Sequence, residues 1–158
     1  MFGILIFLFL VFSIYFYMVY LKEYVEVTRV YKTLRKLLES RDLLILKILP
    51  DMKNKKLAQK ILNLINERRI KSKVSYDDGI NADATLNLEL KNLYDEINNM
   101  KKNEIQDEVF KHIVLMEKQL KVTRKRYSEA VTKYNLGLTV HPKVLIKIMH
   151  MRPLELYK

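Results

Sequence analysis

The sequence predicts an all-α protein in which an N-terminal transmembrane helix is followed by an antiparallel bundle of three to four long helices. Three observations support this fold class. The chain starts with a charge-free apolar run, most of the rest carries apolar residues at helical spacing, and helix breakers are scarce. The 158 residues include only 3 glycines and 3 prolines, which argues against a turn-rich all-β fold and against glycine-rich phosphate-binding loops.

The first element is the apolar run. Residues 1–21 contain no charged side chain, and residues 2–21 are mostly aliphatic or aromatic. A helix of this length spans about 30 Å, the thickness of the hydrocarbon core of a bilayer. A secretory signal peptide would instead have a cationic start, a shorter apolar stretch and a small-residue cleavage site. We therefore expect residues 1–21 to form an uncleaved membrane anchor.

The two flanks of the anchor differ in charge. No cation precedes it, whereas five cations follow it within residues 22–36. Because positive residues beside a transmembrane helix tend to stay in the cytoplasm, we expect a single-pass protein of the cell membrane with residues 22–158 inside. Tyr15, Tyr17 and Tyr20 suit the headgroup layer on that side. The opposite orientation, a signal anchor with its tail outside, is the alternative.

The next elements are also expected to be helical. Residues 22–49 continue the anchor without a gap, and Pro50 ends that helix because proline disfavours the α conformation of the residue before it. Further helices cover about residues 54–74 and 84–100, with a turn-rich loop over residues 76–83. The apolar positions expected in the core are Val27, Val30, Leu34, Leu37, Leu38, Leu44, Ile45 and Ile48, then Leu57, Ile61, Leu64 and Ile65, then Leu86, Leu90, Leu93, Ile97 and Met100.

The last long helix has the strongest apolar pattern. Asn103 and Gln106 resemble a capping box at its start, and Gly137 followed by Pro142 should end it. Between these signals runs a seam of residues that should pack against neighbouring helices. The seam consists of Val109, Ile113, Met116, Leu120, Thr123, Tyr127, Ala130, Tyr134 and Gly137.

These elements divide the chain into three parts. Residues 1–21 form the anchor, residues 22–142 form the helical bundle, and residues 143–158 form a tail. The tail is too apolar to be left in solvent, so we expect it to dock on the bundle or lie on the membrane surface. Its apolar residues are Leu145, Ile146, Ile148, Met149, Leu154, Leu156 and Tyr157.

Charge is segregated along the chain, whose net charge is +11. Residues 22–75 carry 15 basic and 6 acidic side chains, residues 76–117 carry 4 and 10, and residues 118–158 carry 10 and 2. Such an excess of cations can attract nucleic acid or anionic lipid. Only 8 of the 29 cations are arginine and no recognition module is visible, so we expect no nucleic-acid partner. Anionic lipid is a candidate partner, because the anchor already holds the basic domain at the bilayer.

Catalysis finds little support in the residue pattern. The chain has no cysteine, which excludes disulfides, thiolate metal sites and a cysteine nucleophile. His112, His141 and His150 are scattered and lack the spacing of a metal-binding helix. Glu108 lies one turn before His112, but a di-iron bundle needs repeated carboxylates that the sequence does not offer. No nucleophile-elbow or phosphate-loop motif exists. We therefore predict that the protein is not an enzyme and binds no cofactor or metal.

The sequence also resembles a known family. The run Arg124-Lys-Arg-Tyr127-Ser-Glu-Ala130-Val131-Thr-Lys-Tyr134-Asn135, followed by His141-Pro142, resembles the C-terminal signature of the LemA family. Glu117 matches the family's glutamate in the same helix, and Arg41-Asp42-Leu43-Leu44 resembles its Arg-x-Asp-Leu-Ile-Pro motif, with Ile45 in place of the proline. Ser128 stands where the family has its first asparagine. The resemblance implies a membrane-anchored helical domain and no particular reaction.

The signature supplies the candidate site. Its aromatic residues either form a recognition patch or, as the seam suggests, pack in the core with their hydroxyls on polar partners. A buried ion pair with another helix would explain the glutamate and the arginine, and the asparagine near the helix end could cap backbone. The candidate interaction or structural residues are Glu117, Arg124, Tyr127, Ala130, Tyr134, Asn135 and Pro142.

Two functions of different classes fit these features. The first is a membrane-anchored helical scaffold or protein-interaction module of the bacterial inner membrane, with an unknown protein partner and no catalytic activity. The second is a peripheral sensor whose basic face and apolar tail contact an anionic lipid surface. Ionic strength separates the two, because lipid binding through a basic face weakens with salt whereas a packed protein interface does not.

Overall fold

The computed structural model describes residues 2–99, 104–140, 143–148 and 151–157. Within these ranges the chain is all-α and has no strand, as predicted. Some residues named in the predictions lie outside the described ranges, namely Met1, Met100, Asn103, His141, Pro142, Met149 and His150. The elements are α1 (Phe2–Ile48), a 3-10 turn η1 (Leu49–Asp51), α2 (Lys55–Val74), α3 (Tyr76–Asn99), α4 (Glu104–Val140) and α5 (Lys143–Ile148).

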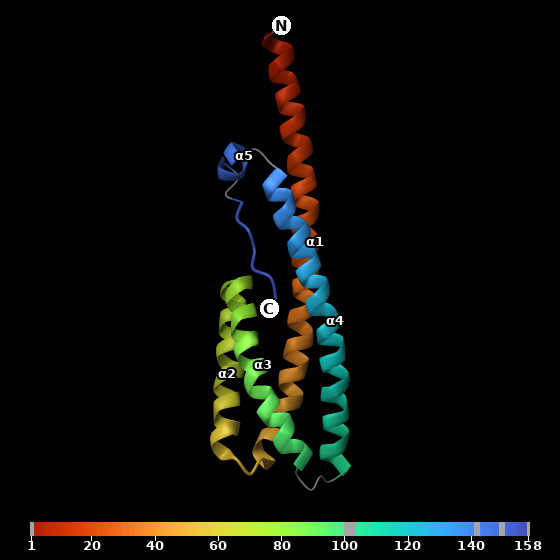
Figure 1. Cartoon of the computed structure of the whole chain (residues 1–158), viewed down its shortest axis with the longest axis vertical. Coiled ribbons are helices and arrows are strands. Elements are labelled where there is room, and N and C mark those ends of the chain that lie inside the picture. Colours follow the sequence, from red (N-terminus) through yellow and green to blue (C-terminus); the bar gives the residue numbers. More distant parts are fainter. Residues whose placement is uncertain (1, 100–103, 141–142, 149–150, 158) are drawn as a thin grey trace.

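Helix α1 is unbroken over its 47 residues, so the apolar run leads into the bundle without a joint (Figure 1). It ends at Ile48, and Pro50 sits in the 3-10 turn that follows, as the sequence predicts. The first part of α1 is long and apolar enough to cross a membrane, and none of its most apolar window is buried by the rest of the molecule. Signal sequences and core helices of soluble proteins meet the same length and composition criteria.

The bundle is built from two pairs of helices. Helix α1 packs along α4, and α2 packs along α3 (Figure 1). The contacts between α1 and α4 occur in reverse chain order, since Tyr20 meets Tyr134 and Tyr31 meets Tyr127. The two helices are therefore antiparallel. The long helices close on one another as the apolar periodicity indicates.

The core consists of two apolar clusters. We call the first the tyrosine cluster and the second the aliphatic cluster. The tyrosine cluster comprises Val27, Tyr31, Leu34, Leu38, Ile80, Leu120, Tyr127, Ala130, Val131, Tyr134, Leu138, Met151 and Leu154. The aliphatic cluster comprises Ile45, Ile48, Leu49, Met52, Ala58, Ile61, Ile65, Leu86, Leu90, Leu93, Ile97 and Ile113. Most positions of the predicted stripes fall in one cluster or the other.

The loop expected over residues 76–83 is wrong. These residues form the first two turns of α3, and the break between α2 and α3 is Ser75, whose backbone is extended. A Cβ on Gly79 would lie 2.6 Å from the Tyr31 hydroxyl and 2.9 Å from the Ser72 Cα. This glycine therefore allows close packing rather than a turn. The nearby Asp77 and Asp78 occupy the first turn of α3, where the helix dipole favours negative charge.

Gly137 does not end the last long helix, which continues to Val140. A Cβ at this position would meet nothing within 4 Å. Glycine inside a helix lowers stability by only about 1 kcal/mol relative to alanine, so a single glycine does not stop a helix that is held by packing. The packing here comes from Tyr134 and Leu138, which are both buried.

The end of the chain returns along the bundle. After α5, residues 151–157 run beside the helices, and Met151 and Leu154 are buried in the tyrosine cluster. Leu156 is exposed. This part of the apolar tail thus docks on the bundle (Figure 1).

Candidate functional site

A layer of charged side chains separates the two apolar clusters. In α1 the tyrosine cluster ends at Leu38 and the aliphatic cluster starts at Ile45, with the charged residues between them. In α3 the same change occurs between Ile80 and Leu86. We call this group the ionic layer. It comprises Arg41, Asp42, Arg68, Asp83, Glu117 and Arg124, and the first four of these side chains are buried to within 1%.

Arg41 stands at the centre of the ionic layer. Its Nη2 donates a 2.7 Å hydrogen bond to Asp83 Oδ1, and its Nη1 donates to Asn87 Oδ1 at 2.8 Å. The same Nη1 lies 3.4 Å from Glu117 Oε1. One α1 side chain therefore joins α3 to α4. Planar guanidinium groups suit such multiple carboxylate contacts in the interior.

Asp42 makes the corresponding link to α2. Arg68 Nη2 donates to Asp42 Oδ2, and Arg69 Nε lies 3.8 Å from the same oxygen. Burial raises the pKa of Asp42, and the adjacent Arg68 and Arg41 oppose that rise. With Arg41 and Asp42 on neighbouring positions, α1 contacts each of the other three long helices through charge.

Glu117 and Arg124, for which the sequence predicted an ion pair with another helix, belong to this layer. Arg124 Nη1 lies 3.6 Å from Glu117 Oε2, and Arg124 Nη2 lies 3.0 Å from Asp83 Oδ2 on α3. Tyr94 Oη donates to Glu117 Oε1 at 3.0 Å. Burial, followed by the charge of Glu117, raises the pKa of Tyr94. Both signature residues therefore take part in an ion-pair network that reaches other helices.

The hydrogen bonding of the layer is incomplete within the described part of the chain. The Nε atoms of Arg41, Arg68 and Arg124 and the Oδ1 atom of Asp42 are buried and have no hydrogen-bond partner there. The three arginines and the three carboxylates balance in charge. Because a buried ion that loses its partner is costly, the layer strongly disfavours any packing that separates these six side chains.

The two signature tyrosines are core residues. Tyr127 is fully buried, its ring contacts Tyr31, and its hydroxyl has no hydrogen-bond partner among the described residues. Tyr134 is also buried, and its hydroxyl donates to the Arg152 carbonyl at 3.0 Å and lies 3.1 Å from Tyr20 Oη. Burial is the main cause that raises the pKa of both phenols. A polar partner was expected for both hydroxyls, and the structure gives one only to Tyr134.

Asn135 binds backbone, but not the end of its own helix. Its Nδ2 donates to the Leu154 carbonyl at 2.8 Å, and its Oδ1 accepts from the Leu154 N–H at 3.0 Å. A single amide therefore satisfies both backbone groups of one residue in the returning segment. Ala130 is buried in the tyrosine cluster, where a small side chain fits between the helices.

The last described residue closes the ionic layer. Tyr157 Oη accepts a hydrogen bond from Asn87 Nδ2 at 3.2 Å, and the Arg124 guanidinium lies 4.9 Å from the centre of the Tyr157 ring. Ser128 Oγ donates to the Tyr157 carbonyl at 3.4 Å. Residues 151–157 thus connect the tyrosine cluster to the ionic layer.

The sequence interpretation missed Arg68, Asp83, Asn87 and Tyr94. Asp83 was expected in a loop, where a carboxylate needs no partner. A signal for the α1 members existed, because Arg41 and Asp42 continue the stripe of buried positions that passes through the flanking leucine and isoleucine at 38 and 45. Charged residues on the buried side of a helix require partners on the facing helices.

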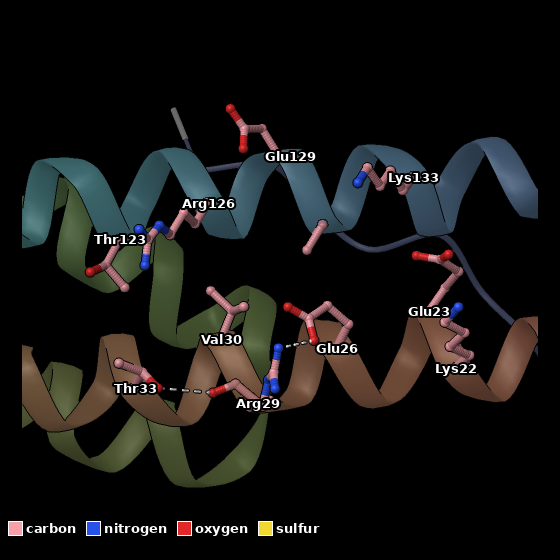
Figure 2. Close-up of a pocket in the computed structure, with 11 residues that line it drawn as sticks. Lys22, Glu23, Glu26, Arg29, Val30, Thr33, Thr123, Arg126, Glu129 and Lys133 are labelled. Atoms are coloured by element: carbon pink, nitrogen blue, oxygen red, sulfur yellow. Dashed lines mark hydrogen bonds and ion pairs between the residues drawn. The ribbon is translucent and has the colours of Figure 1, made fainter.

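Helix α4 forms one surface groove with α1 and another with α3. The first has a volume of about 640 Å³ and lies between α1 and α4. Figure 2 shows Glu26 and Val30 extending from α1 toward α4 and Arg126 extending the opposite way, so the groove presents charges of both signs. Lys22, the residue directly after the apolar run, also lines this groove.

The second groove has a volume of about 510 Å³ and lies between α3 and α4. Its wall is apolar and aromatic, whereas one side carries three cations, one of which belongs to the ionic layer. It is lined by Tyr94, Phe110, Ile113, Val114, Glu117, Lys118, Lys121 and Arg124.

Within the described ranges, no group of three histidine, cysteine, aspartate or glutamate side chains is arranged to hold a metal ion. His112 is exposed and lies 4.0 Å from Glu108, one turn away on the surface of α4. The predicted absence of metal, cofactor and catalytic activity stays a prediction. In comparisons with known proteins, the chain matches no family model, no curated protein and no solved structure.

Proposed function

We propose that this chain is a membrane-anchored helical scaffold or protein-interaction module, inserted once in the bacterial inner membrane with the bundle in the cytoplasm. The continuity of α1 carries this proposal. One helix holds the exposed apolar run and also the buried face from Val27 to Ile48. A bundle built on the anchor helix itself is held at a fixed height and orientation relative to the bilayer, which suits the presentation of a binding surface.

The ionic layer supports a structural rather than a catalytic role. Each of its carboxylates is paired with at least one arginine, namely Asp42 with Arg68, Asp83 with Arg41, and Glu117 with Arg124. A general acid or base must exchange its proton with a substrate, and a carboxylate held in such pairs is poorly placed to do so. We therefore propose that the layer fixes the packing of the four long helices.

We further propose kinship with the LemA family. The resemblance rests on two motifs far apart in the chain, one at residues 41–44 and one at residues 117–142. Arg41 and Asp42 of the first motif lie in the same ionic layer as Glu117 and Arg124 of the second. A shared fold would explain why both motifs occur together, and this contact supports the proposal.

The groove between α3 and α4 is the partner surface that we propose. Its wall of Phe110, Ile113 and Val114 offers an apolar surface, and Lys118 and Lys121 add positive charge along one side. Amphipathic helices bind such grooves through an apolar face. The positive side selects for acidic residues next to that face, so the proposed partner segment is an acidic amphipathic helix of another protein.

Site-specific photocrosslinking in the full chain tests this proposal. Val114 and Val122 are both exposed valines on α4, but only Val114 lines the groove. A photoreactive residue at 114 should give a discrete adduct with another protein in bacterial membranes, and the K118E/K121E change should abolish it. The same residue at 122 is the matched control. The proposal fails if 114 gives no adduct, if both positions give the same adducts, or if the adduct is a second copy of this chain.

A further inference from the structure

The end of α4 lies beside the apolar run of α1. The contact between Tyr20 and Tyr134 fixes the register of the two antiparallel helices. Val140 is six residues beyond Tyr134, or about 9 Å along the helix axis. It therefore comes level with about residue 14 of α1, which is inside the charge-free run. Any bilayer that surrounds this run also meets the last turns of α4.

Two outward-facing side chains at this end of α4 are large and apolar. Leu136 is 59% exposed and Val140 is 74% exposed. On α1, Tyr15, Tyr17 and Met18 are also exposed at the same level. Such a mixture of aromatic and aliphatic side chains is typical of the layer between headgroups and acyl chains.

Cations accompany these apolar side chains. Lys133 is exposed two turns before the end of α4, and Lys143 and Lys147 are exposed on α5. Arg152 follows α5 and is also exposed. Figure 1 places α5 at the end of the bundle from which the apolar run projects. Each cation near an anionic membrane surface strengthens binding by about fivefold.

We propose that the last turns of α4 together with α5 dock on the anionic phospholipid surface of the membrane that holds the anchor. Leu136 and Val140 then lie among the upper acyl chains, and Lys143 and Lys147 lie among the headgroups. This inference rests on the proposed membrane insertion, but it assigns a lipid contact to the bundle itself. A second copy of the chain is the competing occupant of this apolar surface. A second copy would bring the same cations to the contact and repel the first, whereas anionic lipid attracts them.

Nitroxide labels on single cysteines test the proposal in the full chain, which has no cysteine of its own. The protein is reconstituted in vesicles of phosphatidylcholine with phosphatidylglycerol, and each label is challenged with oxygen and with a water-soluble nickel chelate. The label on Val140→Cys should be more accessible to oxygen, and less accessible to the nickel chelate, than the label on Val122→Cys. Val122 is the matched control, because it is also an exposed valine of α4 and lies about 27 Å from Val140 along the axis.

A third label separates this inference from the proposed insertion. Val11→Cys, in the middle of the apolar run, reports whether α1 is in the bilayer at all. If the label at residue 11 is in lipid while the label at residue 140 is as exposed to water as the label at residue 122, only the docking of α4 and α5 is overturned. If the label at residue 11 is also exposed to water, both the membrane insertion and the lipid docking are overturned. Spin–spin broadening between labels at 140 would reveal a second copy and would also overturn the lipid contact.

A separate comparison tests whether the docking needs anionic lipid. Vesicles of phosphatidylcholine alone should leave the label at 140 shallower than vesicles that contain phosphatidylglycerol. The K143E/K147E change on α5 should remove this dependence on phosphatidylglycerol. The K118E/K121E change, on α4 and far from the anchor, should leave it intact. Equal depth in both kinds of vesicle, or equal effects of the two double changes, would contradict a docking surface for anionic lipid.

Discussion

The two halves of α1 are both apolar, but they place their apolar side chains differently. In residues 2–19 large apolar side chains are exposed around the helix, as at Phe7, Leu8 and Phe9. In residues 27–48 one stripe is buried, and most of the exposed positions are charged or polar. Leu8 is 52% exposed and Leu34 is 0% exposed, although they are the same residue type in the same helix.

We propose that this difference reflects two solvents for one helix. A stripe of buried residues is typical of a helix in a protein bundle, whereas apolar residues on all sides are typical of a membrane span. Ser13, a polar residue within the first half, donates its hydroxyl to the Phe9 carbonyl at 2.8 Å. Such internal bonding satisfies a hydroxyl where no water is present. We therefore expect the first half to contribute little to the stability of the bundle.

Removal of a buried charge should have the largest effect on the second half. Arg41→Ala leaves Asp83 and Glu117 with Arg124 as their only arginine partner, so one buried negative charge of the ionic layer is no longer balanced. We expect this change to lower the free energy of unfolding by about 3–5 kcal/mol. Arg29, whose side chain is 75% exposed and pairs with Glu26, is the control. Arg29→Ala should change it by at most about 1 kcal/mol. Denaturant unfolding of the full chain in mild detergent measures both, and equal effects would contradict a buried ionic layer.

The same substitution in the two halves gives the cleanest contrast. Leu34→Ala opens a cavity in the tyrosine cluster and should lower the free energy of unfolding of the bundle by about 2–5 kcal/mol. Leu8→Ala removes an exposed side chain and should change it by no more than about 0.5 kcal/mol. The same denaturant experiment applies. A large effect at Leu8 would show that the first half packs against protein.

Two glycines in other helices test whether close packing against the second half of α1 matters for stability. Gly79→Ala forces a Cβ against Tyr31 and the backbone of Ser72, and should destabilise the bundle by about 1–3 kcal/mol. Gly137→Ala meets open space in a helical backbone and should stabilise α4 by up to about 1 kcal/mol. Opposite signs in thermal melts support this account. A stabilising Gly79→Ala would contradict the close packing of Gly79 against Tyr31 and Ser72.

The smallest expected effects concern hydroxyl groups. Tyr134→Phe removes the bonds to Tyr20 and to the Arg152 carbonyl at the junction of the two halves, and should cost about 1–2 kcal/mol. Tyr127→Phe removes a buried hydroxyl that has no partner among the described residues, so it should be neutral or stabilising. Unfolding free energies of the two variants test this order, and the reverse order would place a polar partner beside Tyr127.

The helices were predictable from the sequence because their apolar periodicity is regular and helix breakers are few. The single break after α1 followed from Pro50. The start of α3 was missed because Gly79 and its neighbours have the composition of a turn, whereas the contact with Tyr31 that explains the glycine is 48 residues away in the chain. Local composition contains no information on such a contact.

The candidate site was predictable only in part. Glu117 and Arg124 stood out through the resemblance, and their ion pairing with another helix follows from buried charge. Their partners Arg41 and Asp83 could not be assigned, because the facing positions of separate helices depend on the packing angles and on the register of the bundle. Tyr157 was noted only as an apolar tail residue, and its place beside Arg124 depends on the path of residues 151–157.

The central claim is that α1 is one helix in two solvents, and a cysteine scan along it tests this claim most directly. Each single cysteine in the full chain, reconstituted in vesicles, is treated with a water-soluble maleimide. We expect no reaction anywhere in residues 4–19. From residue 22 to 48, exposed positions such as Lys32, Lys36 and Lys47 should react, whereas Leu34, Leu38 and Ile45 should not. Reaction along one face of residues 4–19, with protection along the other, would contradict the claim, because it would show a helix packed on protein in water.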